Sequence, residues 1–197
     1  MTIRKANSSD IIEIVEIHMN RFHNFFLTSL GSSFLRIFYK AFLKSPGILL
    51  VLEDEGEVKG FVAGTRDNRG FYKKIVKNNF LSFFLIGIKL LFAKPVSLLR
   101  VGYKIIKSDK NSIIFAELLS IASKKNKRGY GKLLLKGFES EVNNYNPDLL
   151  PVALTTDYDE NEKAVRFYRD SGYVVLEVFE SFRGRKMYRF IKYFNNI

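Results

Sequence analysis

The spacing of apolar residues changes repeatedly along the chain, and each change marks a predicted strand or helix. Short runs of mostly apolar residues predict strands, whereas apolar residues that recur every three or four positions predict helices. On this basis we expect a strand over Thr2 to Ala6, a helix after Asp10 and a second helix over Ser32 to Leu43. Two strands, Gly47 to Leu52 and Val58 to Thr65, are joined by a short polar turn and are expected to form a hairpin.

The same two spacings alternate in the last part of the chain. The expected elements are a strand over Ile113 to Ala122, a helix carrying Leu133, Leu134, Phe138 and Val142, a strand over Leu150 to Thr156, a helix over Asn161 to Ser171, and a closing hairpin of Tyr173 to Phe179 with Lys186 to Tyr193. The order of elements is therefore β-α-α-β-β-insert-β-α-β-α-β-β. This order indicates an α/β fold of the α+β type.

The insert between the two regions, Phe71 to Lys110, is basic and apolar. It holds nine Lys or Arg residues and one acid, and its run from Phe80 to Ala93 is apolar nearly all round. A helix that crosses a bilayer needs about 20 apolar residues, and this run is shorter and is interrupted by Lys89. Three interpretations remain open: a buried helix, a lid over a substrate, or a basic amphipathic segment in peripheral contact with an anionic membrane. Phe and Leu crowd together here instead of alternating with basic residues, so no nucleic-acid partner is expected.

Composition narrows the class of protein. With 197 residues, of which 47% are hydrophobic, the chain is expected to form a single domain over 1–197. It contains no cysteine, which excludes a disulfide framework, a thiolate zinc site and a cysteine nucleophile. The first residues lack the apolar segment of a secretory signal, so a cytoplasmic location is expected. The net charge of +12 favours an anionic partner. The two histidines, His18 and His23, are interpreted as packing or surface residues, and no metal site is expected.

A candidate anion site lies where the strand over Ile113 to Ala122 leads into the next helix. The connecting loop, Ser123 to Arg128, is basic and is followed by Gly129-Tyr130-Gly131. A strand that enters a glycine-containing loop and then a helix directs unpaired backbone N–H groups and the positive end of the helix dipole toward one point. The nucleotide-binding G-x-x-x-x-G-K-[ST] and dinucleotide-binding G-x-G-x-x-G patterns are both absent. The glycines alone are equally compatible with a plain strand-to-helix connection.

Two stretches of sequence together resemble a known family. The first is Asn126-Lys127-Arg128-Gly129-Tyr130-Gly131. The second, about thirty residues later, is Asn161-x-x-Ala164-x-x-Phe167-Tyr168 followed by Ser171-Gly172-Tyr173. They resemble the Q/R-x-x-G-x-G/A loop and the N-x-x-A-x-x-F-Y-x-x-x-G-F stretch of the GNAT superfamily of acetyl-CoA-dependent N-acetyltransferases, in the same order and on the expected elements. Asn126 stands where the family has Gln or Arg, and the insert lies outside the family's common core.

The resemblance implies a fold, a cofactor and a set of binding residues. The fold would be a mixed, mostly antiparallel central sheet flanked by helices, with a helical insert at about 71–110. The cofactor would be acetyl-CoA, acting as the acetyl donor. Its diphosphate would be held by the amides and side chains of Asn126, Lys127, Arg128, Gly129, Tyr130, Gly131 and Lys132, and its pantetheine by the exposed backbone of Ile121, Ala122 and Ser123.

Acetyl transfer also needs a proton donor for the departing thiolate and an amine that is neutral when it attacks. Tyr168 matches the family's frequent general acid, and a phenol with a pKa near 10 can donate to such a leaving group; its alternative is a tyrosine packed in the core. Glu117 is the candidate base, because it shares strand parity with Leu119 and Ile121 and its carboxylate is expected to project to the same face as their side chains. The alternatives are an ion pair for Glu117, or attack with no dedicated base. Asn161 is a cofactor contact, a support for its helix, or a simple N-cap.

The sequence therefore predicts an N-acetyltransferase that works by direct attack within a ternary complex, since no cysteine can carry the acetyl group. The acceptor would be a primary amine, for which an amino sugar or another small anionic amine is favoured, bound near Phe22 to Leu30 and the insert. Two other classes stay open. One is a non-catalytic acyl-CoA-binding or regulatory module, and the other is a membrane-surface protein that acts through the insert.

Overall fold

The described part of the chain contains the predicted elements in the predicted order. A computed structural model describes residues 1–23, 25–78, 113–124, 129–145, 150–181 and 184–194. The elements are β1 (Thr2–Lys5), α1 (Ile11–Arg21), α2 (Phe26–Ser29), α3 (Ser32–Ala41), β2 (Gly47–Asp54), β3 (Glu57–Thr65), α4 (Phe71–Asn78), β4 (Ala116–Ser123), α7 (Tyr130–Tyr145), β5 (Val152–Asp157), α8 (Glu162–Asp170), β6 (Val174–Glu180) and β7 (Lys186–Lys192). Of the insert, 71–78 form α4, and 79–110 lie outside the described residues, so its three interpretations stay predictions.

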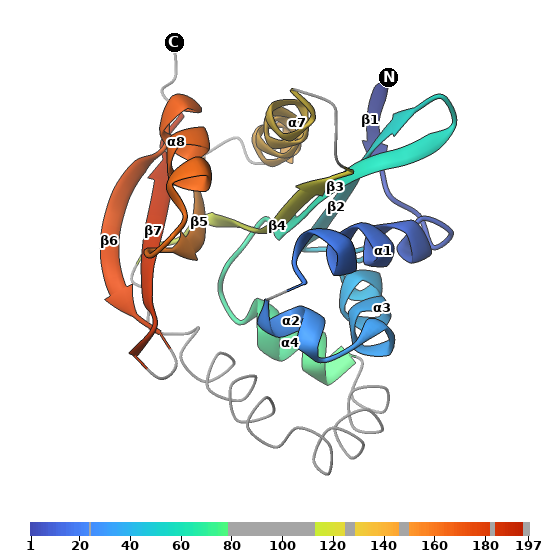
Figure 1. Ribbon diagram of the computed structural model, residues 1–197, viewed down its shortest axis with the longest axis horizontal. Helices are drawn as coiled ribbons and strands as arrows, with labels where there is room; N and C mark the ends of the chain where they lie inside the picture. The colour runs from blue at the N-terminus through green and yellow to red at the C-terminus, as the bar shows by residue number, and fades with distance from the viewer. Residues whose placement is uncertain (24, 79–112, 125–128, 146–149, 182–183, 195–197) are drawn as a thin grey trace.

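The strands form one seven-stranded sheet in the order β1-β2-β3-β4-β5-β7-β6 (Figure 1). All neighbouring strands are antiparallel except β4 and β5, which are parallel. The predicted mixed, mostly antiparallel sheet flanked by helices is therefore confirmed. The first hairpin is tighter than expected, because β2 and β3 pair out to Asp54 and Glu57. Only Glu55 and Gly56 form its turn, both with positive φ, which is the geometry that best fits the twist of paired strands.

Helices cover both faces of the sheet, which gives two separate cores. The first core joins α1 and α3 to side chains of β2 and β3 such as Val51 and Phe61. The second joins α7 and α8 to the alternate residues of the same strands, for example Leu52 and Val62. In Figure 1, α7 lies above β3 and β4, and α1 and α3 lie below them. Because both faces are buried, β2 and β3 are nearly continuous apolar runs rather than alternating ones.

One extra residue in β4 breaks the regular pairing of β3 and β4. Ala63 of β3 pairs with Ser120, and the next residue, Gly64, pairs with Leu118, so Leu119 is a β-bulge. Gly64 lies so close to this segment that a Cβ atom there would be 2.3 Å from the carbonyl oxygen of Glu117. A side chain larger than hydrogen would therefore push β4 away from β3.

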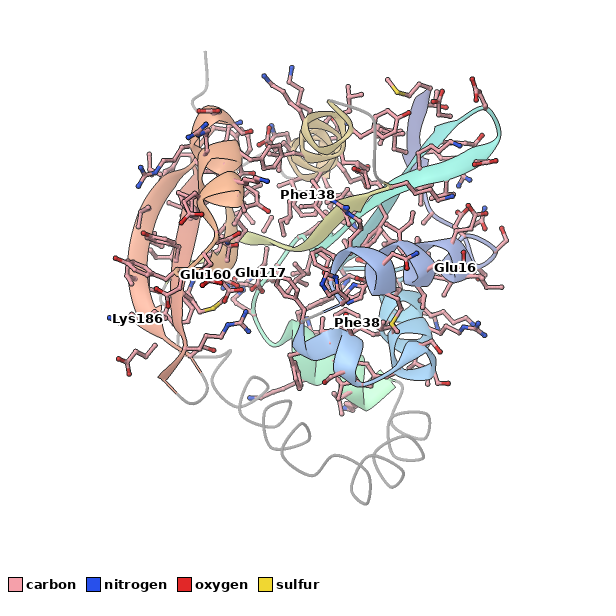
Figure 2. All side chains as sticks on the ribbon, in the orientation of Figure 1. Glu16, Phe38, Glu117, Phe138, Glu160 and Lys186 are labelled. Carbon is pink, nitrogen blue, oxygen red and sulfur yellow. The ribbon has the colours of Figure 1, made fainter. Side chains whose placement is uncertain are left out.

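The bulge corrects one prediction about Glu117. Leu119 packs against the first core, as expected for a residue on the same face as Glu117, whereas Ile121 packs against the second core. The extra residue shifts the alternation by one position, so Glu117 and Leu119 share a face and Ile121 does not. Figure 2 shows Glu117 on the same side of β4 as Phe38 of α3, with Phe138 of α7 on the opposite side.

His18 is buried in the layer formed by α1 and α3, and His23 is exposed. The Nδ1 atom of His18 lies 2.6 Å from the hydroxyl oxygen of Tyr39, and the residue is 2% exposed. Burial disfavours the charged imidazolium and lowers the pKa of His18 to about 4. This histidine is therefore neutral in the folded protein at neutral pH.

The buried His18 should make the protein less stable as the pH falls from about 6.5 to 4. In that window the unfolded chain binds a proton that the folded chain does not, so the free energy of unfolding should drop by up to about 3 kcal/mol at pH 4. Urea unfolding at pH 7 and pH 4.5 would measure this drop. A His18→Gln variant should lack this part of the pH dependence, and the exposed-site control His23→Gln should keep it. Equal pH dependence in both variants would contradict the assignment to His18.

Candidate active site

The two parallel strands at the centre of the sheet separate at the bulge. β4 and β5 pair only at Ala116 with Val152, Glu117 with Ala153, and Leu118 with Leu154. β4 then continues to Ser123 and remains attached to β3, where the N–H of Lys124 donates to the carbonyl of Lys59 at 2.7 Å. Beyond Leu118, the peptide groups on the edge of β4 that faces β5 have no β5 partner. These groups include those of the predicted pantetheine-binding residues Ile121, Ala122 and Ser123.

The first turn of α7, where the anion site is predicted, follows the end of β4. Gly129 has a φ of 95°, a conformation that favours glycine, and its carbonyl accepts the first helical hydrogen bond, from Leu133, at 3.0 Å. The N–H groups of Gly131 and Lys132 come before that bond, so they have no acceptor within the helix. They lie at the positive end of the helix dipole. Three residues predicted for this site, Asn126, Lys127 and Arg128, lie outside the described residues.

The Tyr130 side chain has a structural partner that the sequence did not reveal. Its hydroxyl donates to Oδ2 of Asp54 at 2.8 Å, and its ring is buried in the second core. The bond ties the start of α7 to the end of β2. The Tyr130 side chain is therefore engaged by Asp54 within the protein. The two residues lie 76 positions apart in the chain, so no local sequence pattern predicts this hydrogen bond.

The two motif stretches are brought together by a close approach of α7 and α8. A Cβ atom at Gly131 would lie 3.5 Å from the Phe167 ring, so the first turn of α7 rests directly against α8. Tyr168 follows Phe167 on the same helix, and the two rings are 5.1 Å apart between centroids. The anion site and the candidate proton donor therefore lie on neighbouring helix surfaces.

Tyr168 is both packed in the core and able to donate a proton. It is 7% exposed, and its ring lies against those of Tyr173 and Phe190, with centroid distances of 5.9 and 6.0 Å. Burial raises the pKa of the Tyr168 phenol well above its usual value, so the hydroxyl stays protonated. Within the described residues the hydroxyl makes no hydrogen bond. Its role as proton donor stays a prediction.

Asn161 supports α8 rather than capping it. It stands at the N-cap position, but its side chain makes no cap hydrogen bond. Instead, its Nδ2 atom donates to the Thr156 hydroxyl at 2.5 Å and to the Asp157 carbonyl at 3.1 Å. The simple N-cap interpretation is therefore wrong, because the side chain ties the start of α8 to the end of β5. A contact between Asn161 and the cofactor stays a prediction.

Comparison with known proteins identifies the family. A family model described as "Acetyltransferase (GNAT) family" matches residues 11–173. The chain therefore belongs to the GNAT acetyltransferase family, whose members transfer an acetyl group from acetyl-CoA to an amine, and the predicted acetyl-CoA donor is confirmed. A search of curated proteins finds no match.

Solved structures share the fold at low sequence identity. Ard1 from Thermoplasma volcanium has a TM-score of 0.62 at 18% identity, covering 99% of this chain and 98% of the other. A ribosomal-protein-alanine N-acetyltransferase from Brucella melitensis has a TM-score of 0.63 at 16% identity, covering 98% and 100%. An aminoglycoside 6'-N-acetyltransferase solved with coenzyme A has a TM-score of 0.62 at 13% identity, covering 98% and 97%. Identities this low support the fold and do not extend to the acceptor.

None of the helices in the described ranges is both long and apolar enough to span a bilayer.

A pair of glycine variants would test the anion site. Acetyl-CoA at about 100 times its dissociation constant should stabilise the protein by about 2.7 kcal/mol, which raises the melting temperature by roughly 5–10 °C for a chain of this size. Gly129→Ala would strain the loop at its positive φ, so we expect about a tenfold loss of affinity, which would halve the rise at the same concentration.

Gly131→Ala is the matched control, because a Cβ atom there would meet Phe167 at an ordinary contact distance. We expect this variant to keep both its fold and its response to acetyl-CoA. Thermal melts of the three proteins with and without acetyl-CoA measure both effects. A full response in Gly129→Ala would show that the loop conformation does not matter for binding.

Proposed function

We propose that the protein acetylates a primary amine by direct attack on acetyl-CoA in a ternary complex, with Tyr168 as proton donor to the departing thiolate. The close approach of Gly131 to Phe167 carries this proposal, because it sets the anion site of α7 beside the helix that bears Tyr168. β4 and β5 pair only as far as Leu118 and Leu154, which leaves backbone groups of β4 for an extended ligand.

Each part of acetyl-CoA has a complementary group in the described residues. The N–H groups of Gly131 and Lys132 suit the diphosphate, since they precede the first hydrogen bond of the helix and lie at the positive end of its dipole. The edge of β4 at Ile121, Ala122 and Ser123 suits the pantetheine, whose amides can pair with a strand edge as another strand would. The thioester would then lie near the bulge, and the basic residues of the loop would add attraction for the phosphates.

The transfer balances as a single displacement. The amine nitrogen attacks the thioester carbonyl carbon, the carbon–sulfur bond breaks, and the sulfur takes its proton from the Tyr168 hydroxyl. The nitrogen loses one proton as the amide forms, and a proton returned through solvent restores the Tyr168 phenol. Because burial raises the pKa of Tyr168, this phenol is a weak acid without ligand and acts mainly by hydrogen bonding until negative charge develops on sulfur. No cysteine exists to form an acetyl-enzyme.

Glu117 is the proposed base for the amine. It lies on the face of β4 that α1 and α3 cover, which is also the side of the short helix α2 within Phe22 to Leu30 (Figure 2). An acceptor entering from this side could lose its proton to the Glu117 carboxylate, directly or through a water molecule. The acceptor proposed is an amino sugar linked to a nucleotide or another small anionic amine, because the chain carries a net charge of +12.

An acceptor screen with a tyrosine variant tests the proposed function. Acetyl-CoA consumption would be measured with amino-sugar nucleotides, polyamines and peptides as acceptors. With the best acceptor, Tyr168→Phe should lower kcat by about 10²-fold or more and leave acetyl-CoA binding unchanged, because it removes only the proton donor. Tyr173→Phe, a second buried tyrosine of the same core, should keep kcat near the wild-type value.

Three outcomes would contradict parts of this proposal. Acetyl-CoA binding without turnover of any amine would favour a non-catalytic acyl-CoA-binding module. Turnover with polyamines alone would rule out the anionic acceptor. A silent Tyr168→Phe change would rule out the phenol as the proton donor.

Substitution of Glu117 tests the base through the pH profile. Glu117→Gln should lower the rate at neutral pH by about 10²-fold. The deficit should shrink as the pH approaches the pKa of the acceptor amine, because the amine is then already neutral. Glu16→Gln is the charge-matched control and should follow the wild-type pH profile. Glu16 lies on the exposed face of α1, away from Glu117 (Figure 2). A pH-independent deficit in Glu117→Gln would contradict a role in proton removal.

A further inference from the structure

Helices α3 and α4 carry basic residues and no acidic ones. On α3, Arg36 and Lys40 lie about one turn apart, and Lys44 follows just beyond the end of the helix; all three are exposed. Residues four positions apart lie on the same side of a helix. The other side of α3 carries Phe38 and leads to Phe42, and both are buried in the first core. The helix therefore has a buried aromatic side and an exposed basic side.

α4 is divided in the same way. Lys73 and Lys77 are exposed, whereas Phe71 and Ile75 are buried in the first core. The Phe71 ring lies 5.2 Å from that of Phe42 between centroids, so α4 packs against the end of α3. Both helices lie on the same side of the sheet (Figure 1). Their exposed basic side chains, which we call the basic surface, are Arg36, Lys40, Lys44, Lys73, Lys74 and Lys77.

The fold itself does not account for this charge. Arg36 and Lys40, at positions i and i+4, repel each other and slightly destabilise α3. Within the described residues, none of Arg36, Lys40 and Lys44 forms an ion pair, and residues 22–52 include no Asp or Glu. Lys192 on β7, by contrast, has its Nζ atom 3.0 Å from Oε1 of Glu139. Positive charge that the protein does not neutralise attracts an anionic partner.

Apolar residues beside the basic surface indicate which kind of anion it suits. Phe25, immediately before α2, is 45% exposed, and its ring lies 5.2 Å from that of Phe22. α2 packs against α3. In the sequence, α4 leads into the run from Phe80 to Ala93, where Phe and Leu crowd together. Cations beside grouped apolar residues are typical of segments that lie on an anionic bilayer, whereas aromatic residues that stack on bases alternate with basic ones.

We propose that the basic surface binds the phosphate headgroups of an anionic membrane. The contact is peripheral, because electrostatic attraction holds the protein against the headgroups and salt weakens it. The inference does not depend on the proposed function, since the first turn of α7 packs into the second core, on the other face of the sheet.

Flotation with lipid vesicles tests the proposal. The wild-type protein should float with vesicles of phosphatidylcholine mixed with phosphatidylglycerol, and added salt should release it. Each basic residue near an anionic bilayer strengthens binding about fivefold, so Arg36→Gln/Lys40→Gln/Lys44→Gln should bind about 100-fold more weakly. Lys74→Gln/Lys77→Gln should bind about 25-fold more weakly for the same reason.

A triple variant of α8 is the matched control for net charge. Lys163→Gln/Arg166→Gln/Arg169→Gln removes the same three charges from exposed positions of a helix on the other face of the sheet. We expect this variant to keep most of its affinity for the anionic vesicles. A loss equal to that of the α3 variant would assign binding to net charge and overturn the basic surface.

Four further outcomes would overturn the proposal. These are no flotation of the wild-type protein at low salt, equal flotation with phosphatidylcholine alone, wild-type flotation of both the α3 and α4 variants, and binding to poly(U) RNA without binding to vesicles. The α3 and α4 variants should keep the melting-temperature rise with acetyl-CoA, which shows that they are folded. No such rise in the wild-type protein would contradict the proposed function and leave the membrane test unaffected.

Discussion

The arrangement of the site depends on one backbone constraint, the extra residue at Leu119 in β4. Before it, β4 is hydrogen-bonded on both edges, to β3 and to β5; after it, β4 keeps only β3. Backbone N–H and C=O groups inside a protein need partners. Strand edges that separate in the middle of a sheet therefore offer sites for the amide and carbonyl groups of an extended ligand. Pantetheine carries such groups, which is why this point suits acetyl-CoA.

The helix α7 connects the two parts of the sheet that separate here. At its first turn, Tyr130 donates to Asp54 at the end of β2. Farther along, Glu139 accepts hydrogen bonds from Lys192 on β7 and from the Tyr173 hydroxyl, each at 3.0 Å. These contacts hold α7 to strands on both sides of the point where β4 and β5 separate, so the N–H groups of its first turn keep a fixed direction. A preorganised donor set costs little free energy to arrange when the diphosphate binds.

Two buried tyrosines near β4 show how similar environments can serve different purposes. Burial raises the pKa of both Tyr39 and Tyr168, so both phenols remain protonated. Tyr39 uses its hydroxyl inside the protein, with His18. The Tyr168 hydroxyl makes no hydrogen bond within the described residues and stays available for a leaving group. The partners of each hydroxyl, rather than its burial, separate a structural tyrosine from a candidate catalytic one.

The sequence alone determined the order of the elements and contained the two motif stretches, because apolar spacing and turn residues are local properties. The choice of Tyr168 came from the family resemblance and stays a proposal. It could not locate the bulge. Leu118, Leu119 and Ile121 are all apolar, and no glycine or proline marks the extra residue. The helices on the two faces of the sheet decided which side each of these residues faces. Glu117 shares a face with Leu119 and not with Ile121. The polar networks of Tyr130 with Asp54 and of His18 with Tyr39 also join residues far apart in the chain. Only the tertiary structure brings them together, because a hydrogen bond depends on distances in space that local sequence spacing does not encode.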